Sequence, residues 1–201
     1  MPSSATRCSG RFPQTPDEAP LLSGQIFVVA GPSGVGKGSI ASAVRQRLAG
    51  LWLSRSWTTR PRRDGEPADA YVFVDRAEFD THVAAGGFLE WAEVFGNRYG
   101  TPWPEPPEGH DVLLEIDVQG AGQVRARHPE ALVVFVEAPS RQAQEQRLRG
   151  RGDADDVIAR RLAAAPEEER AGRALADHVV VNDDLGRAIE EVAAILESRR
   201  Q

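Results

Sequence analysis

Short apolar runs, each followed by a stretch with helical spacing, recur along most of the chain. The run from Gln25 to Ala30 is the first, and Ile40, Val44 and Leu48 then share one helical face. Continuous apolar runs of this length are typical of strands buried in a parallel sheet. Similar strands are expected at 112–116, 131–136 and 178–181, with helices between them and at 155–173 and 185–198. The alternation predicts an α/β fold, a three-layer core with a mostly parallel sheet.

Residues 54–101 break this alternation with several short strand-like segments. Strands are expected at 51–59 and 71–74, a helix at 76–85, and a hairpin over 88–101 that turns at Gly96-Asn97. A proline-rich linker, 102–109, leads back to the alternating pattern. These features predict a β-rich sub-domain, 54–101, inserted into a core formed by 24–53, 102–149 and 174–201.

Composition and charge narrow the functional classes. The formal net charge is −6, which does not favour non-specific binding of nucleic acid. No apolar run is long enough to span a bilayer, and residues 1–23 lack the apolar centre of a secretory signal. Those residues, rich in Pro, Ser and Thr, are predicted to form a disordered tail, and Cys8 within it is the only cysteine. We expect a cytoplasmic protein with neither membrane nor nucleic acid as a partner.

A glycine-rich segment between the first strand and the first helix carries the strongest motif. Gly31-Pro-Ser-Gly-Val-Gly-Lys37 fits G-x-x-x-x-G-K, whose backbone N–H groups cradle phosphates. Lys37 is the only lysine among 24 basic residues, and its ammonium can reach the β- and γ-phosphates of a nucleotide. The alternative is an ordinary strand-to-helix turn with a surface lysine. The predicted phosphate-binding residues are Gly31, Pro32, Ser33, Gly34, Val35, Gly36, Lys37, Gly38 and Ser39.

Several further segments, in order along the chain, resemble the guanylate kinase family. They are Ser54-Arg-Ser-Trp-Thr-Thr-Arg-Pro-Arg-Arg-Asp-Gly-Glu66 with Tyr71-Val-Phe-Val74, Phe88-Leu-Glu-Trp-Ala-Glu-Val-Phe-Gly-Asn-Arg-Tyr-Gly-Thr101, Val112-Leu-Leu-Glu-Ile-Asp-Val-Gln-Gly120, Gly150-Arg-Gly152 with Arg160-Arg161, and Val181-Asn-Asp-Asp-Leu185. The resemblance implies a P-loop NTPase-like core, a GMP-binding sub-domain at 54–101 and a helical lid at 150–173. It implies transfer of a phosphoryl group from ATP to GMP, with Mg²⁺ as cofactor.

The resemblance also assigns roles to residues. Arginine forks bind phosphate oxygens, and a carboxylate can accept from the N1–H and N2–H₂ groups of guanine. Glu90 would read the base, with Asp117 as a second carboxylate that could instead organise magnesium waters. The implied GMP-binding residues are Ser56, Arg60, Arg63, Tyr71, Glu90, Tyr99, Thr101 and Asp117.

On the donor side, the resemblance places Asn182 beside the adenine and makes Lys37, Arg151 and Arg161 the catalytic residues, with Arg147 a weaker candidate. The family pattern has Ser or Thr directly after the lysine as a magnesium ligand. Here that position is Gly38, so the hydroxyl would come from Ser39, through water. For every arginine the alternative is a solvated basic loop or helix.

Two other functions remain open at this point. One is a different small-molecule kinase on the same scaffold, such as a sugar-phosphate kinase, against which the base-reading residues Glu90 and Ser56 argue. The other is a non-catalytic interaction module of guanylate-kinase-like type. The intact phosphate loop and the short chain argue against that module.

Overall fold

The computed structural model describes residues 24–200, and the tail predicted at 1–23 lies outside the described residues. Its centre is a sheet of five parallel strands in the order β2-β7-β1-β8-β9. The strands are β1 (Ile26–Ala30), β2 (Leu51–Leu53), β7 (Asp111–Glu115), β8 (Leu132–Glu137) and β9 (His178–Val181). The mostly parallel sheet predicted from the sequence is confirmed.

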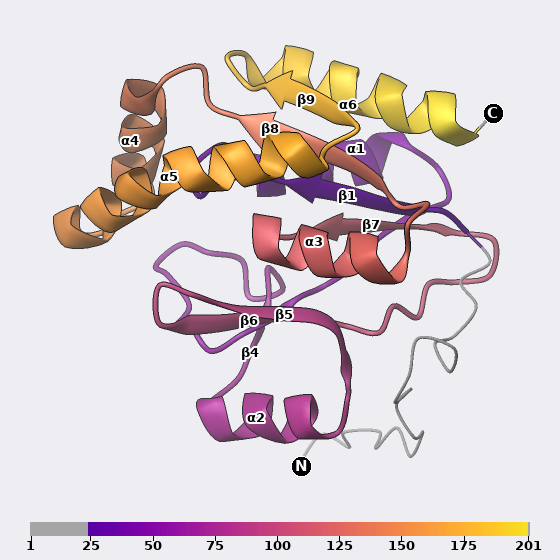
Figure 1. Ribbon diagram of the computed structural model, residues 1–201, viewed down its shortest axis with the longest axis horizontal. Coiled ribbons are helices and arrows are strands. Elements are labelled where there is room, and N and C mark those ends of the chain that lie inside the picture. Colours follow the sequence, from indigo (N-terminus) through magenta and orange to yellow (C-terminus); the bar gives the residue numbers. More distant parts are fainter. Residues whose placement is uncertain (1–23, 201) are drawn as a thin grey trace.

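Helices cover both faces of this sheet, because side chains alternate between the faces along each buried strand. Phe27 and Val29 pack with α1 (Lys37–Arg47) and α6 (Leu185–Arg200), and α6 lies along the top of the core in Figure 1. Ile26 and Val28 point the other way and pack with α3 (Val118–Arg127), which lies below the strands. The result is the predicted three-layer core.

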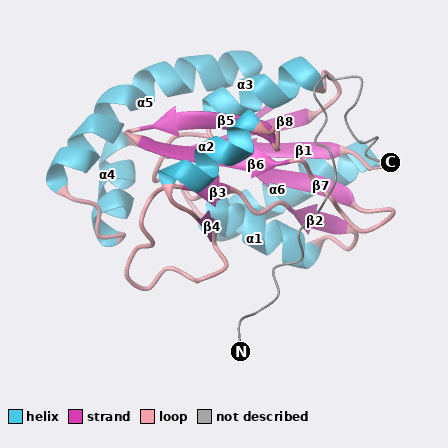
Figure 2. Ribbon diagram, turned by 90° about the horizontal axis from the view of Figure 1, so that it is seen from below, coloured by secondary structure: helices cyan, strands magenta, loops and turns pink. Residues whose placement is uncertain are grey.

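The inserted sub-domain has a sheet of its own, in the order β4-β3-β6-β5. It contains β3 (Trp57–Thr58), β4 (Val72–Phe73), α2 (Arg76–Ala84), β5 (Phe88–Val94) and β6 (Asn97–Pro102). Figures 1 and 2 show α2 lying across the β5–β6 hairpin, on the side away from the core.

Two local predictions need correction. The single strand expected at 51–59 is two strands in different sheets, because the chain leaves the core after Leu53 and enters the insert at Trp57. The hairpin turn lies at Phe95-Gly96, one residue earlier than predicted, and both residues have positive φ, 51° and 80°. Two successive positive φ values are typical of the tight turn that matches the twist of a hairpin.

Two further helices, α4 (Arg141–Gly150) and α5 (Asp155–Leu175), project from one end of the core (Figure 1). The C-terminal end of α5 is anchored on the sheet. Arg173 forms two hydrogen bonds of 2.6 Å to Glu137 of β8, and Gly172 lies directly against Phe135. The boundary that we drew after residue 173 therefore falls inside a continuous helix. Among residues 24–200 there is no helix with the length and apolar character needed to cross a membrane.

Candidate active site

The phosphate loop connects β1 to α1, at the carboxyl edge of the parallel sheet. Gly36 precedes the first helical residue with a φ of 99°, a conformation that glycine adopts without strain. The ammonium of Lys37 lies over the loop and donates to the carbonyl oxygens of Gly31 at 2.7 Å and Pro32 at 3.1 Å. Burial lowers the pKa of Lys37, and the nearby carboxylates of Glu115 and Asp117 oppose that shift.

Side chains from distant elements brace this loop. Gln144 of α4 is buried and donates to the Ser33 carbonyl at 2.7 Å. The Asn182 amide donates to the Val35 carbonyl at 2.8 Å, and its own Oδ1 is buried with no hydrogen-bond partner among residues 24–200. Arg147 donates to the carbonyls of Val35 at 3.1 Å and Asn182 at 2.7 Å. The sequence did not reveal Gln144, and in this structure Arg147 donates to one backbone carbonyl of the phosphate loop and to that of Asn182, the residue after β9.

One cavity of 1140 Å³ brings most of the predicted site residues together. Four of them, Gly31, Pro32, Val35 and Thr101, do not line it and are buried. The predicted residues that line the cavity are Ser33, Gly34, Gly36, Lys37, Gly38, Ser39, Ser56, Arg60, Arg63, Tyr71, Glu90, Tyr99, Asp117, Arg151, Arg161 and Asn182. The cavity therefore spans the core, the insert and the region predicted to be a lid.

A buried carboxylate forms the floor of the insert side. Glu90 of β5 is 3% exposed, and its Oε1 accepts from the backbone N–H of Thr101 at 3.0 Å and from the Thr101 hydroxyl at 2.5 Å. Ser56 extends the chain of hydroxyls, with its Oγ 3.1 Å from Thr101 Oγ1. Burial raises the pKa of Glu90 to about 7, although the hydrogen bonds from Thr101 favour the charged form.

Two arginines and two tyrosines of the insert, Arg60, Arg63, Tyr71 and Tyr99, line the same cavity. Arg60 is nearly buried and makes two hydrogen bonds to the Glu66 carboxylate, at 2.7 and 3.0 Å. Its guanidinium also lies 5.6 Å from the ring centre of Tyr71. The ring centres of Tyr71 and Tyr99 are 6.0 Å apart. Glu66 thus orients Arg60. The sequence placed Glu66 within a family motif but gave no role to its side chain.

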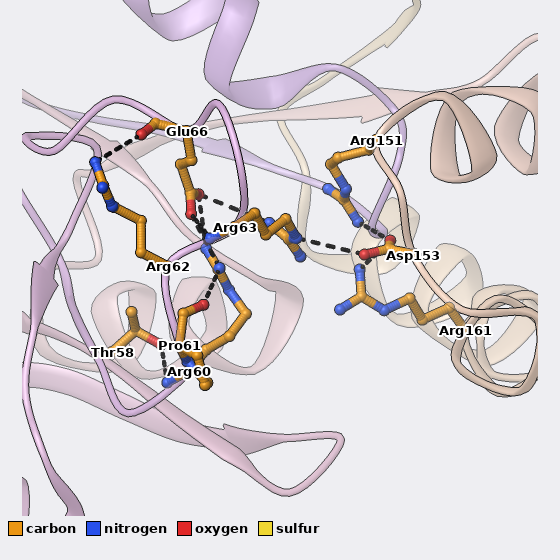
Figure 3. A network of polar contacts seen from close by, with 9 residues as sticks. All are labelled: Thr58, Arg60, Pro61, Arg62, Arg63, Glu66, Arg151, Asp153 and Arg161. Carbon is orange, nitrogen blue, oxygen red and sulfur yellow. Dashed lines mark hydrogen bonds and ion pairs between the residues drawn. The ribbon is translucent and has the colours of Figure 1, made fainter.

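A second carboxylate, Asp153, lies among Arg63, Arg151 and Arg161 (Figure 3). Arg63 comes from the insert, whereas Arg151 follows α4 and Arg161 lies on α5. The sequence reasoning named all three arginines and did not name Asp153. The side chains of all three arginines line the same cavity as Glu90.

The end of β7 supplies two more carboxylates. Glu115 is the last residue of the strand, and one of its oxygens is 3.9 Å from Lys37 Nζ. Burial raises the pKa of Glu115, which Lys37 opposes. Asp117 accepts from the N–H groups of Gln119 and Gly120 and thereby caps α3. Glu115 was not among the predicted site residues. Its position directly after the apolar residues of a buried strand could have indicated a carboxylate at the edge of the sheet where the phosphate loop lies.

Comparisons with known proteins agree with this geometry. A family model described as guanylate kinase matches residues 23–199. The chain belongs to the guanylate kinase family. It is 49% identical over 179 residues to a guanylate kinase of Symbiobacterium thermophilum, with 86% of this chain and 84% of the relative covered. It is 43% identical over 183 residues to a guanylate kinase of Carboxydothermus hydrogenoformans, with coverage of 88% and 89%.

A solved structure supports the same assignment. The crystal structure of guanylate kinase from Anaplasma phagocytophilum superposes with a TM-score of 0.72 at 31% identity, covering 88% of this chain and 86% of that one. The family resemblance predicted from the sequence is thereby confirmed, as is the α/β fold. As a member of the guanylate kinase family, the chain is a nucleoside monophosphate kinase.

Proposed function

We propose that the protein transfers the γ-phosphoryl group of ATP to GMP, giving ADP and GDP. The bond from the γ-phosphorus to the bridging oxygen of ATP breaks, and a bond to a phosphate oxygen of GMP forms. The single observation that carries the proposal is one cavity that is lined both by the phosphate loop and by the Glu90 carboxylate. Both reactants can therefore occupy it side by side, which is the main requirement for phosphoryl transfer.

Guanine recognition rests on the Glu90 floor. Both hydrogen bonds that the Glu90 carboxylate accepts within residues 24–200 end on Oε1. We infer that Oε2 accepts from guanine, whose N1–H and N2–H₂ donors lie side by side. Ser56 and Thr101 supply hydroxyls for the O6 edge, and Asp117 lines the same cavity as a second acceptor.

Recognition of the GMP phosphate depends on arginine side chains of the insert. Arg60 and Arg63, with the hydroxyls of Tyr71 and Tyr99, surround the place proposed for the GMP phosphate. Arginine forks suit a group with about two negative charges, because each fork can donate two parallel hydrogen bonds. Arg151 and Arg161 would stabilise the charge that is shared in the transition state, together with Lys37.

The oxygen atoms that line the cavity near Lys37 are of the kind that can serve as ligands of magnesium or of its bound waters. The Ser39 hydroxyl and the carboxylates of Glu115 and Asp117 line the cavity, and magnesium prefers oxygen ligands. Within residues 24–200 no group of three or more acidic, His or Cys side chains could hold a metal ion. We therefore propose that Mg²⁺ arrives with ATP, that phosphates and waters hold most of it, and that Ser39, Glu115 and Asp117 contact those waters. When bound, Mg²⁺ neutralises charge on the phosphates.

The test is an ADP-release assay with Mg²⁺, ATP and, in turn, GMP, AMP, CMP, UMP and a sugar phosphate. Turnover with GMP and only background with the others is expected. Rapid turnover with another acceptor and none with GMP would show a different small-molecule kinase. No turnover with any acceptor, together with no ATP binding, would indicate a non-catalytic module.

A further inference from the structure

Asp153 lies where the insert meets the region between α4 and α5. Its side chain is 7% exposed, and its backbone N–H donates to the Leu148 carbonyl at the end of α4. Three guanidinium groups surround the carboxylate (Figure 3). Arg151 and Arg161 donate to Oδ2 at 2.6 and 3.2 Å, and Arg63 Nε lies 3.4 Å from Oδ1.

The charge on Asp153 opposes the repulsion among these three arginines. Burial lowers the pKa of Arg63 and of Arg161, and repulsion from Arg151 lowers both further. For Asp153 burial acts in the opposite sense, yet the hydrogen bond from Arg151 and the positive charges of all three arginines hold its pKa below the usual range. The carboxylate is therefore ionised at neutral pH and offsets repulsion among three cations.

A second contact joins the same two regions. The Arg161 guanidinium lies 5.7 Å from the ring centre of Phe95, the hairpin-turn residue of the insert. Asp153 and Arg161 thus each contact the insert, through Arg63 and Phe95. Asp153 and Arg161 lie 58 and 66 positions after Phe95 in the sequence.

We propose that Asp153 is a positioning residue for phosphoryl transfer, which gathers the acceptor-phosphate arginine Arg63 and the arginines Arg151 and Arg161 into one cluster across the insert and the lid. The inference rests on the proposed function. Each guanidinium has N–H groups that do not donate to Asp153, and the buried Arg161 Nε has no hydrogen-bond partner in the part of the chain that the structure describes. Those groups remain to bind phosphate oxygens, while Asp153 itself stays off the substrate.

The kinetic test compares Asp153→Asn with Asp156→Asn. Asp156 lies on the first turn of α5 and pairs with exposed Arg160, so Asp156→Asn removes the same charge at a nearby exposed position. Asp153→Asn is expected to lower kcat about 10- to 100-fold with little change in the KM for ATP, because small displacements of catalytic groups cost factors of this size. Asp156→Asn should stay within about twofold of the wild type. Asp153→Glu restores the charge and should recover part of the rate.

A double-mutant cycle separates positioning from a general loss of structure. Arg161→Ala should lower kcat much less in the Asp153→Asn background than in the wild type, because the cluster is already dispersed. Additive losses, or a wild-type kcat in Asp153→Asn, would overturn the proposal. A fall in the thermal midpoint alone would mean that Asp153 merely stabilises the fold.

A distance measurement without nucleotide tests the role of Asp153 separately from the proposed reaction. Spin labels at exposed Ala68 of the insert and Ala159 of α5, in a Cys8→Ser background, report the distance between the two regions. Asp153→Asn should lengthen and broaden that distance distribution, and Asp156→Asn should not. If the distance responds but the wild type does not phosphorylate GMP, the link stands and the proposed reaction fails. If GMP is phosphorylated and neither the distance nor kcat responds, the role of Asp153 is wrong.

Discussion

The two ends of the cavity are built in different ways. The donor end is a backbone loop, and its conformation is held by side chains that bond to its carbonyls, including Gln144 and Asn182. The acceptor end is built from side chains, with Glu90 on a buried floor and Arg60 oriented by Glu66. A backbone site presents donors to any triphosphate, whereas a side-chain site can select one base.

On the proposed function, this difference places base specificity at the acceptor end. Phosphates are alike in all nucleotides, so a loop of N–H groups and one ammonium is sufficient to hold them. A base is distinguished by its pattern of donors and acceptors, and a buried carboxylate that lacks a matching donor is costly. Substitutions at the donor end should therefore lower the rate with every acceptor. Substitutions at the acceptor end should change the use of GMP and leave the binding of ATP unchanged.

The largest effect is expected at Lys37. Lys37→Ala removes the ammonium that lies over the phosphate loop and should lower kcat by about 10³-fold, since preorganised charges act mainly on the transition state. Lys37→Arg should recover little of the rate, because the planar fork is larger than an ammonium. Steady-state kinetics on variants with wild-type circular dichroism check this. A kcat within tenfold of the wild type would remove Lys37 from the mechanism.

At the acceptor end, Glu90→Gln should raise the KM for GMP about 100-fold and leave that for ATP almost unchanged. The substitution keeps the size of the side chain but loses the charge and introduces an N–H donor. Glu93→Gln is the control, because Glu93 lies on the same strand with an exposed side chain that pairs with Arg76. Loss of GMP use in Glu93→Gln but not in Glu90→Gln would contradict the assignment.

A smaller effect concerns pH and stability. Because the pKa of Glu90 is raised from 4.5 to about 7 by burial, the folded protein holds a proton there that the unfolded chain releases. The contribution of Glu90 to stability therefore falls as pH rises from about 4.5 to 7, by at most about 3 kcal/mol. Urea unfolding at pH 5 and pH 8 should show Glu90→Gln gaining stability relative to the wild type at the higher pH. An equal difference at both pH values would contradict the raised pKa.

The sequence predicted the loop between β1 and α1 better than the cluster around Asp153, for a physical reason. The phosphate loop is a contiguous segment between a strand and a helix, and its chemistry follows from local conformation. The strand alternation was likewise local, so the parallel core could be predicted. The turn at Phe95-Gly96 was displaced by one residue because a bulky residue with positive φ is hard to anticipate from sequence.

The orienting residues were missed because they act through distant partners. Gln144 lies 111 positions from the carbonyl to which it donates, and Asp153 lies 90 positions after Arg63. Each sits in a polar helical or loop segment where a solvated side chain is the ordinary expectation. Only the packing of α4 and α5 against the loop and the insert shows what these side chains contact.

Base selection by Glu90 is the central claim, and a series of acceptors tests it most directly. GMP offers both N1–H and N2–H₂, inosine monophosphate keeps only N1–H, and AMP offers an N1 acceptor in that place. Under saturating Mg²⁺ and ATP, we expect kcat/KM to fall in the order GMP, IMP, AMP, with AMP lower than GMP by about 10⁴-fold. In Glu90→Gln the three values should converge. If the wild-type enzyme uses AMP as well as GMP, then Glu90 does not read the base.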